Sequence, residues 1–376
     1  MLPINSGNVT NQLPKGCQMK TPYEKGKQVR KFILDEVSRH PKDIVRLTEK
    51  TFQITRQAVY RHTHNLIEKG LLVAEGSTRR RTYKLKAITS KTIYLPISEA
   101  LQEDVIWREQ VGPVLGEVPP NIEDICFHGF TEMVNNVRDH SAGKIAMIEV
   151  QRTAVSIIIM VYDDGVGIFK KIKDNFGLDD QRHAILELAK GKLTTDPERH
   201  SGEGIFFTSR MFDIFNISSG GLHFIHGVVG QDILMGDVEE GMKGTLVTME
   251  INIDSILTVK EVFDEYSDDD YGFTRTVIPV RLVKYGNENL VSRSQAKRLL
   301  VRFEKFKEVI LDFDRVETIG QAFADEIFRV YQQHNPQVHI MHINANEEVE
   351  RSIKRATQGG FLTISGGALG EPKKTQ

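Results

Sequence analysis

Three short runs of residues have the types and spacing needed to hold a charged small molecule. In the first, Glu132, Asn136 and His140 recur every fourth residue, so a helix would present them in one row. A carboxylate, an amide and an imidazole in a row could orient water, bind a hydrated Mg²⁺ and approach phosphate oxygens. Glutamate and asparagine at this spacing also occur on ordinary helix surfaces, so the row needs a second motif to carry meaning.

The second and third runs place glycines beside acidic residues. Asp163 follows an apolar strand, and Gly165 and Gly167 come two and four residues later. A carboxylate at a strand end can accept a hydrogen bond from an exocyclic amine such as that of adenine, and glycines let backbone approach a flat ring. The third run, Gly202-Glu203-Gly204, opens a helix. Its backbone N–H groups and the helix N-terminus suit a phosphate chain.

The order of these motifs is more informative than any one of them. Glu-x-x-x-Asn, Asp-x-Gly-x-Gly, Gly-x-Gly and then Gly244-Thr245 on a last strand resemble the GHKL ATPase superfamily, which includes gyrase B, MutL and sensor histidine kinases. The resemblance covers about residues 120–253. It implies an antiparallel sheet backed by helices, with ATP and Mg²⁺ as cofactors.

The resemblance also implies roles for individual residues. Asp163 would bind the adenine amine, Asn136 would hold Mg²⁺, and Glu132 would act as the general base or orient water. Residues 168–201 match the mobile ATP lid in position. The expected ATP-binding residues are Asn136, Asp139, His140, Asp163, Gly165, Gly167, Ile168, Gly202, Gly204, Ile205 and Thr245.

The sequence departs from the GHKL pattern in two ways that affect whether ATP is hydrolysed or its phosphate transferred. No histidine is followed by an acidic residue as in the phosphoacceptor box of the kinases, because His40 precedes Pro41 while His62 and His64 lie in another helix. The lysine-bearing loop that helps gyrase and MutL hydrolyse ATP is not recognisable either. We therefore expect slow ATP hydrolysis, or binding without hydrolysis.

The first quarter of the chain is basic. Residues 1–90 hold 18 lysines and arginines against 7 acidic residues, a charge of +11, whereas the remainder holds 31 against 44, a charge of −13. This asymmetry is typical of a module that touches nucleic acid joined to one that does other work. A solvated basic arm would have the same composition.

A helix expected to begin at Thr55 and to end at Lys69-Gly70 would carry the DNA contacts. Val59, Thr63 and Leu66 form its apolar face, and a hairpin with a basic tip follows. Residues 25–86 resemble a winged helix-turn-helix, which implies double-stranded DNA as a partner, with a protein-contact module as the alternative. The expected DNA-binding residues are Arg56, Gln57, Tyr60, Arg61 and His64 on the helix and Arg79, Arg80 and Arg81 on the wing.

The last part of the chain reads as a compact β-α unit that begins with a strand at Val277–Val283. Residues 308–325 resemble the strand-turn-helix of STAS-like domains, as in anti-sigma-factor antagonists, and the resemblance extends over roughly 275–358. It implies a protein partner. Gly320-Gln321-Ala322 supplies no hydroxyl where the antagonists have a phosphorylated serine, so we expect no such phosphoswitch. A role in packing or oligomer contacts is the alternative.

We therefore expect an α+β multidomain protein in which a winged helix, a GHKL-type α/β sandwich and a STAS-like domain follow one another. A run of acidic residues at 264–270 is too polar to pack and marks a boundary. The expected divisions are a tail at 1–20, the winged helix at 21–90, the ATP-binding domain at 91–258, an acidic linker at 259–273, the STAS-like domain at 274–368 and a tail at 369–376.

The composition of the chain indicates the cellular compartment in which we expect the protein. Two cysteines cannot build a disulfide scaffold and suit a reducing compartment. No apolar run approaches the roughly 20 residues that span a bilayer, and the N-terminus lacks a signal pattern. We expect a cytoplasmic homodimer with no membrane contact.

Together these features predict a regulatory switch in which ATP and Mg²⁺ binding changes how the two end modules contact DNA and a protein partner. One alternative is an anti-sigma-type serine/threonine kinase that acts on a partner in trans. Another is an ATP-gated DNA-remodelling or defence factor.

Overall fold

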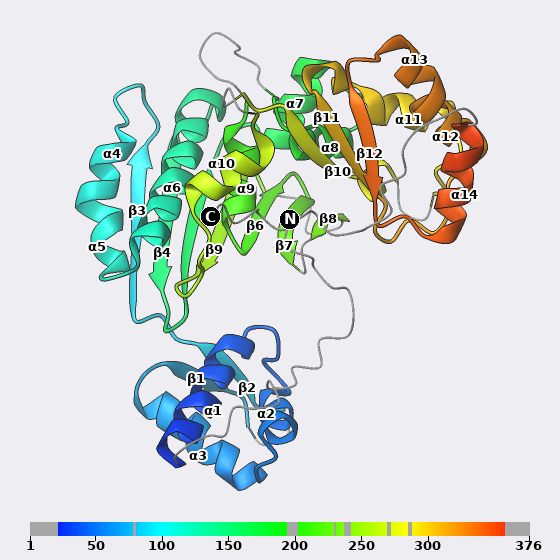
Figure 1. Cartoon of the computed structure of the whole chain (residues 1–376). Coiled ribbons are helices and arrows are strands. Elements are labelled where there is room, and N and C mark those ends of the chain that lie inside the picture. Colours follow the sequence, from blue (N-terminus) through cyan, green and yellow to red (C-terminus); the bar gives the residue numbers. More distant parts are fainter. Residues whose placement is uncertain are drawn as a thin grey trace, which may run out of the picture.

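Helices and strands gather around three separate sheets (Figure 1). The computed structural model describes residues 22–77, 80–193, 202–228, 231–236, 242–268, 272–284 and 288–357, so the two expected tails lie outside the described residues. We call the three parts the N-terminal unit (22–85), the central unit (89–266) and the C-terminal unit (272–357). The protein is a mixed α/β chain with several sheets, as the sequence predicts at this coarse level.

The N-terminal unit consists of three helices and a hairpin. Thr55 Oγ1 accepts a hydrogen bond from the Ala58 N–H (3.3 Å) and caps the third helix, and Gly70 follows its end with φ +70°. Both ends therefore lie where the sequence predicts them, for the reasons that favour threonine as a cap and glycine as a stop. The elements are α1 (Pro22–Glu36), α2 (Ile44–Phe52), α3 (Arg56–Glu68), β1 (Leu72–Glu75) and β2 (Thr82–Leu85).

The central unit is built on a sheet of seven strands, in which every neighbouring pair is antiparallel. Its order is β3-β4-β5-β9-β6-β7-β8, so β9, the last of these strands along the chain, lies in the middle of the sheet. The strands are β3 (Thr89–Pro96), β4 (Ile145–Arg152), β5 (Ser156–Asp163), β6 (Ile214–Ser219), β7 (Leu222–Val228), β8 (Gln231–Gly236) and β9 (Thr245–Asn252).

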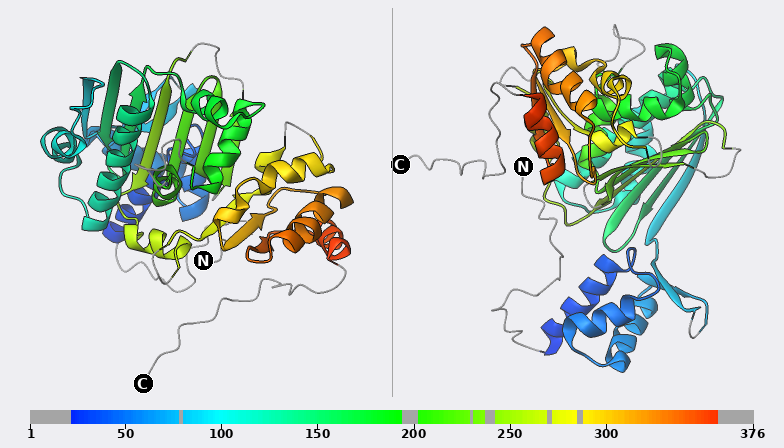
Figure 2. Two further views of the ribbon diagram at one scale, coloured as in Figure 1. Left: turned by 90° about the horizontal axis from the view of Figure 1, so that it is seen from above. Right: turned by 90° about the vertical axis from the view of Figure 1, so that its right-hand side faces the viewer.

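Helices cover one face of this sheet (Figure 2, right). Alternate residues of the strands are buried under them, as Ile157, Ile159 and Val161 of β5 illustrate, because successive side chains of a strand point to opposite faces. The helices are α4 (Glu103–Ile106), α5 (Gly112–Leu115), α6 (Pro120–His140), α7 (Ile168–Phe176), α8 (Gln181–Lys190), α9 (Gly204–Met211) and α10 (Val259–Tyr266), with a π-helical segment at Trp107–Val111.

The C-terminal unit has a three-stranded parallel sheet in the order β10-β11-β12. Parallel neighbours need crossover connections, which are helical here. The elements are β10 (Arg275–Pro279), a 3₁₀ turn at Val280–Val283, α11 (Arg293–Leu300), a 3₁₀ turn at Phe303–Lys305, β11 (Glu308–Asp312), α12 (Gln321–Asp325), a π-helical segment at Glu326–Tyr331, α13 (Gln332–His334), β12 (His339–Ile343) and α14 (Glu347–Ala356).

Two expectations about this region need correction. The first strand ends at Pro279 instead of Val283, because Pro279 lies opposite Asp312, the last residue of its neighbour β11, and the chain then turns. The expected acidic linker at 259–273 is helical over Val259–Tyr266 and packs on the central unit, with Val262 and Tyr266 buried. Glu261, Asp264 and Glu265 lie on one face of this amphipathic helix, a pattern that composition alone does not reveal.

Candidate functional site

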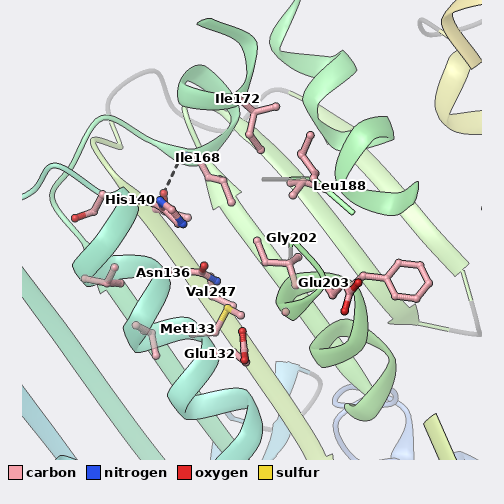
Figure 3. Close-up of a pocket in the computed structure, with 18 of the residues that line it drawn as sticks. Glu132, Met133, Asn136, His140, Ile168, Ile172, Leu188, Gly202, Glu203 and Val247 are labelled. Carbon is pink, nitrogen blue, oxygen red and sulfur yellow. Dashed lines mark hydrogen bonds between the residues drawn. The ribbon is translucent and has the colours of Figure 1, made fainter. Parts of the chain in front are cut away.

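A cavity of about 350 Å³ lies against the covered face of the central sheet. Its walls come from α6, from the ends of β5 and β9, and from α7, α8 and α9. Figure 3 shows Glu132, Asn136 and His140 in a row along α6, with Gly202 and Glu203 across from them. The structure therefore brings residues of all three sequence motifs into one cavity.

Asn136 is one of three polar side chains of α6, with His128 and Asn135, that have a buried atom without a hydrogen-bond partner among the described residues. Its Nδ2 atom is buried and has no hydrogen-bond partner among the described residues. A buried orphan polar atom costs free energy unless a ligand or water completes it. Because the two ends of an amide can exchange by a flip, the same side chain can present either a donor or an oxygen to the cavity.

Asp163 closes the cavity at the end of β5. Its side chain is 4% exposed, and its Oδ1 accepts a hydrogen bond from the Gly165 N–H at 2.9 Å. Burial raises the pKa of the Asp163 carboxyl above its usual range, while hydrogen bonds from Gly165 and Thr245 oppose that rise. Thr245 Oγ1 also accepts from the Ile168 N–H at 3.0 Å, which ties the start of α7 to β9.

Two glycines on the cavity wall have no room for a side chain. A Cβ on Gly167, where φ is +85°, would lie 2.6 Å from Ser219 Oγ. A Cβ on Gly204, at the start of α9, would lie 2.0 Å from the Glu132 carboxylate. The absent side chains let the loop after β5 and the N-terminus of α9 approach the neighbouring elements closely. The α9 N–H groups are thereby brought next to the acidic end of the row on α6.

Two ionisable residues that line the cavity, His128 and Lys171, lie outside the sequence motifs. His128 precedes Glu132 by one helical turn, and burial lowers its pKa, so its imidazole is neutral at pH 7. Its Nε2 is buried without a hydrogen-bond partner among the described residues. Lys171 Nζ donates to the His140 carbonyl at 2.6 Å, and burial lowers its pKa. The four-residue spacing could have revealed His128, whereas nothing local distinguishes Lys171.

The remaining expected residues divide into three groups. Ile168 and Ile205 line the cavity together with Gly202. Gly165 lies behind Asp163, and Asp139 is exposed and pairs with the Arg138 guanidinium at 2.8 Å, so neither lines the cavity. Of the expected lid at 168–201, helices α7 and α8 are present, while residues 194–201 lie outside the described residues.

A divalent cation would find few ligands from the protein alone. Among the described residues, no group of three or more histidine, cysteine, aspartate or glutamate side chains could hold a metal ion. Mg²⁺ often takes one or two protein oxygens and completes its octahedron with water and phosphate. The Asn136 side chain fits such a cation, arriving with a phosphate ligand, when the amide is turned so that its oxygen takes the unpartnered position of Nδ2.

A second candidate surface lies on α3 and the hairpin of the N-terminal unit. The five expected residues of α3 are all exposed, and the Arg56 guanidinium bonds the Tyr60 hydroxyl at 3.0 Å. Arg80 and Arg81 are exposed at the hairpin tip, and Arg79 lies outside the described residues. The helix row and the tip are therefore open to a large partner.

Comparison with known families addresses only the C-terminal unit. A family model described as a STAS-like domain of unknown function (DUF4325) matches residues 295–350. The C-terminal unit is similar to STAS-like domains. The prediction of a STAS-like domain over roughly 275–358 is confirmed at that level, and the matched residues run from α11 into α14.

The assignments of the N-terminal and central units remain predictions. No curated protein matches the chain, and the GHKL and winged-helix interpretations rest on the motifs and the geometry above. None of the helices in the described ranges is long and apolar enough to cross a bilayer.

The raised pKa of Asp163 leads to a stability prediction. A carboxyl whose folded pKa is raised contributes stability below its unfolded pKa and loses that contribution as pH rises through the folded value. At pH 7 the buried carboxylate is therefore unfavourable for folding, and Asp163→Asn should leave the melting temperature unchanged or raise it. Calorimetric melting at pH 7 checks this. The difference between variant and wild type should shrink as pH falls, and a clear drop at pH 7 would contradict the prediction.

Proposed function

We propose that the protein is an ATP- and Mg²⁺-binding regulatory switch with slow ATP hydrolysis at most, in which nucleotide binding alters DNA binding by the N-terminal unit and partner binding by the STAS-like C-terminal unit. The observation that carries the proposal is the buried Asp163 carboxylate beside Thr245, facing the row of Glu132, Asn136 and His140 across a cavity with glycine walls. The antiparallel sheet with helices on one face agrees with the GHKL resemblance.

Each part of the cavity suits one part of a nucleotide. The Asp163 carboxylate would accept a hydrogen bond from the adenine amine, and Gly167 leaves room for the ring. The N–H groups at the start of α9, near Gly202 and Gly204, would bind phosphate oxygens. Mg²⁺, when bound, would offset phosphate charge and take one oxygen from Asn136.

Glu132 would act on a water molecule near the phosphates and would not contact the adenine ring. It lies in the row on α6 and approaches Gly204 at the helix N-terminus where phosphate would bind. A carboxylate there can orient a water molecule or accept its proton. The neutral imidazole of His128, one turn away, adds a second polar group on the same side.

Binding by Asp163 can be measured directly. Asp163→Asn removes a charge-assisted hydrogen bond worth about 1.5–3 kcal/mol, so affinity for a non-hydrolysable ATP analogue should fall about 10- to 150-fold in calorimetric titration. Asp164→Asn is the matched control, because the Asp164 carboxylate bonds the Lys144 and Ile145 N–H groups and does not line the cavity. If Asp163→Asn and Asp164→Asn bind the ATP analogue with equal affinity, Asp163 does not bind the adenine amine.

The fate of the γ-phosphate distinguishes an ATPase, a protein kinase and a switch that only binds ATP. Pure protein is incubated with γ-labelled ATP and Mg²⁺, and nucleotide, phosphate and protein are then separated. Slow release of phosphate is expected, and Glu132→Ala should abolish it while sparing binding, because a base acts mainly in the transition state. Glu123→Ala, on the same helix but exposed, is the control. Label on added partner proteins would favour the kinase alternative, and no transfer at all would leave a binding switch.

The exposed row of α3 and the wing should contribute differently to DNA binding. Arg56→Ala or Arg61→Ala should cost about 1–3 kcal/mol on a selected site and little on random DNA. Neutralising Arg79, Arg80 and Arg81 should weaken binding to all DNA and flatten its salt dependence by up to about one slope unit per lost phosphate contact. Fluorescence anisotropy across a salt series measures both. Failure to select any site, with an unchanged salt slope, would make the unit a protein-contact module.

A further inference from the structure

Helix α8 and the residues that follow it touch the cavity and the C-terminal unit at once. Leu188 and Leu193 line the cavity. The same helix packs against β10 and against the 3₁₀ turn at Val280–Val283 of the C-terminal unit (Figure 1). One wall of the candidate nucleotide site is therefore held between the two units.

Arg302 of the C-terminal unit makes a buried ionic contact with α8. Its guanidinium donates to the Glu187 carboxylate at 2.9 Å and to the Gly191 carbonyl. The Arg302 side chain is 9% exposed and that of Glu187 is 5% exposed. Arg302 also has φ +66°, a left-handed conformation that residues with a Cβ seldom adopt.

Lys190 makes the complementary contacts from the side of α8. Its side chain is fully buried, and its Nζ donates to Glu187 at 2.6 Å and to the Val301 carbonyl at 2.9 Å. In return, Thr276 Oγ1 of β10 donates to the Lys190 carbonyl at 2.8 Å. The last turn of α8 is thus bonded to the C-terminal unit through both side chain and backbone.

Lys192 extends the contact to the glycine loop at the cavity. Its Nζ donates to the Lys305 carbonyl at 2.9 Å and lies over the rings of Phe273 and Phe306, with 5.4 and 5.1 Å to their centroids. The same ammonium is also attracted by Glu203, which lines the cavity between Gly202 and Gly204. A displacement of the C-terminal unit would therefore move Lys192 and change its electrostatic interaction with Glu203 in the glycine loop.

The interface between α8 and the C-terminal unit combines buried charges with apolar contacts. Charges buried between two units lose hydration, and their mutual attraction does little more than offset that loss. Burial lowers the pKa of Lys190 to about 8, which is consistent with such a loss. The charged contacts therefore add little net stability to the docked arrangement, which apolar contacts through Phe273 and Phe306 also stabilise. A ligand that binds one arrangement better than another shifts the equilibrium towards it.

We propose that the STAS-like C-terminal unit is an intramolecular regulator of the cavity: by binding residues 187–192 it preorganises the wall formed by α8, and the docked chain binds nucleotide more tightly than the undocked chain. The inference rests on the proposed nucleotide binding. Because coupling between two equilibria is reciprocal, nucleotide binding strengthens docking, and a protein that competes for the STAS-like surface weakens nucleotide binding.

The test uses the full chain with Arg302→Ala, and with Thr276→Val as a nearly isosteric second variant that removes one hydrogen bond. Arg293→Ala is the control, since Arg293 is exposed and pairs with Asp325 and Glu326 within the C-terminal unit. Amide hydrogen exchange without nucleotide should rise over residues 181–193 in Arg302→Ala and stay unchanged in Arg293→Ala. Affinity for a non-hydrolysable ATP analogue should fall about 5- to 150-fold in Arg302→Ala, less in Thr276→Val, and not in Arg293→Ala.

The outcomes distinguish the two proposals. If the wild-type chain binds the analogue and the variants bind equally well, or more tightly, the regulatory inference is overturned while the proposed function stands. Unchanged exchange over residues 181–193 in both Arg302→Ala and Thr276→Val also overturns it. A wild-type chain that binds no nucleotide overturns the proposed function, and the regulation falls with it.

Discussion

The pairing register between β5 and β9 is the constraint on which the candidate site depends. In this register Asp163 lies opposite Thr245, and their side chains meet at the same end of the covered face. Side chains alternate between the two faces of a sheet, so a slip of one residue would carry one of the pair to the open face. Thr245 then could not bond the Ile168 N–H, and α7 would lose its anchor. The acidic strand end, the glycine loop and the first helix of the expected lid thus share one register.

The cavity walls come from segments that lie far apart in the chain and are held together by close backbone approaches. Gly244 shows how close these are, because a Cβ there would lie 1.8 Å from the Asp163 carbonyl oxygen. On the opposite side, α10 covers the cavity with Phe263, whose ring stacks on that of Phe207 in α9 at 4.2 Å. The same aromatic cluster continues through Phe273 to Phe306 of the C-terminal unit. The aromatic residues that line the cavity therefore belong to the same cluster as those at the interface between the central and C-terminal units.

The central unit contacts its neighbours in two unlike ways. Towards the N-terminal unit the contact is light, with an exposed pair between Lys31 and Asp254 at 2.5 Å and the short connection from β2 to β3. Exposed pairs contribute little to stability, so this junction is free to adapt to a bound partner. Towards the C-terminal unit the contact is buried and charged, through Glu187, Lys190 and Arg302. The central unit is therefore joined to the N-terminal unit by exposed contacts and to the C-terminal unit by buried ones.

Local chemistry in the sequence was enough to place the Thr55 cap, the Gly70 stop, the strand that ends at Asp163 and the STAS-like run after Glu308, because each depends on neighbouring residues or on a short periodic pattern. The helical nature of 259–266 was missed because its acidic residues dominate composition while its apolar residues are spaced at one face. The place of Lys171 in the cavity and the bond between Arg302 and Glu187 were decided by the tertiary structure alone. Burial, and the pairing of residues more than a hundred positions apart, arise only when separate elements pack, and no local pattern encodes them.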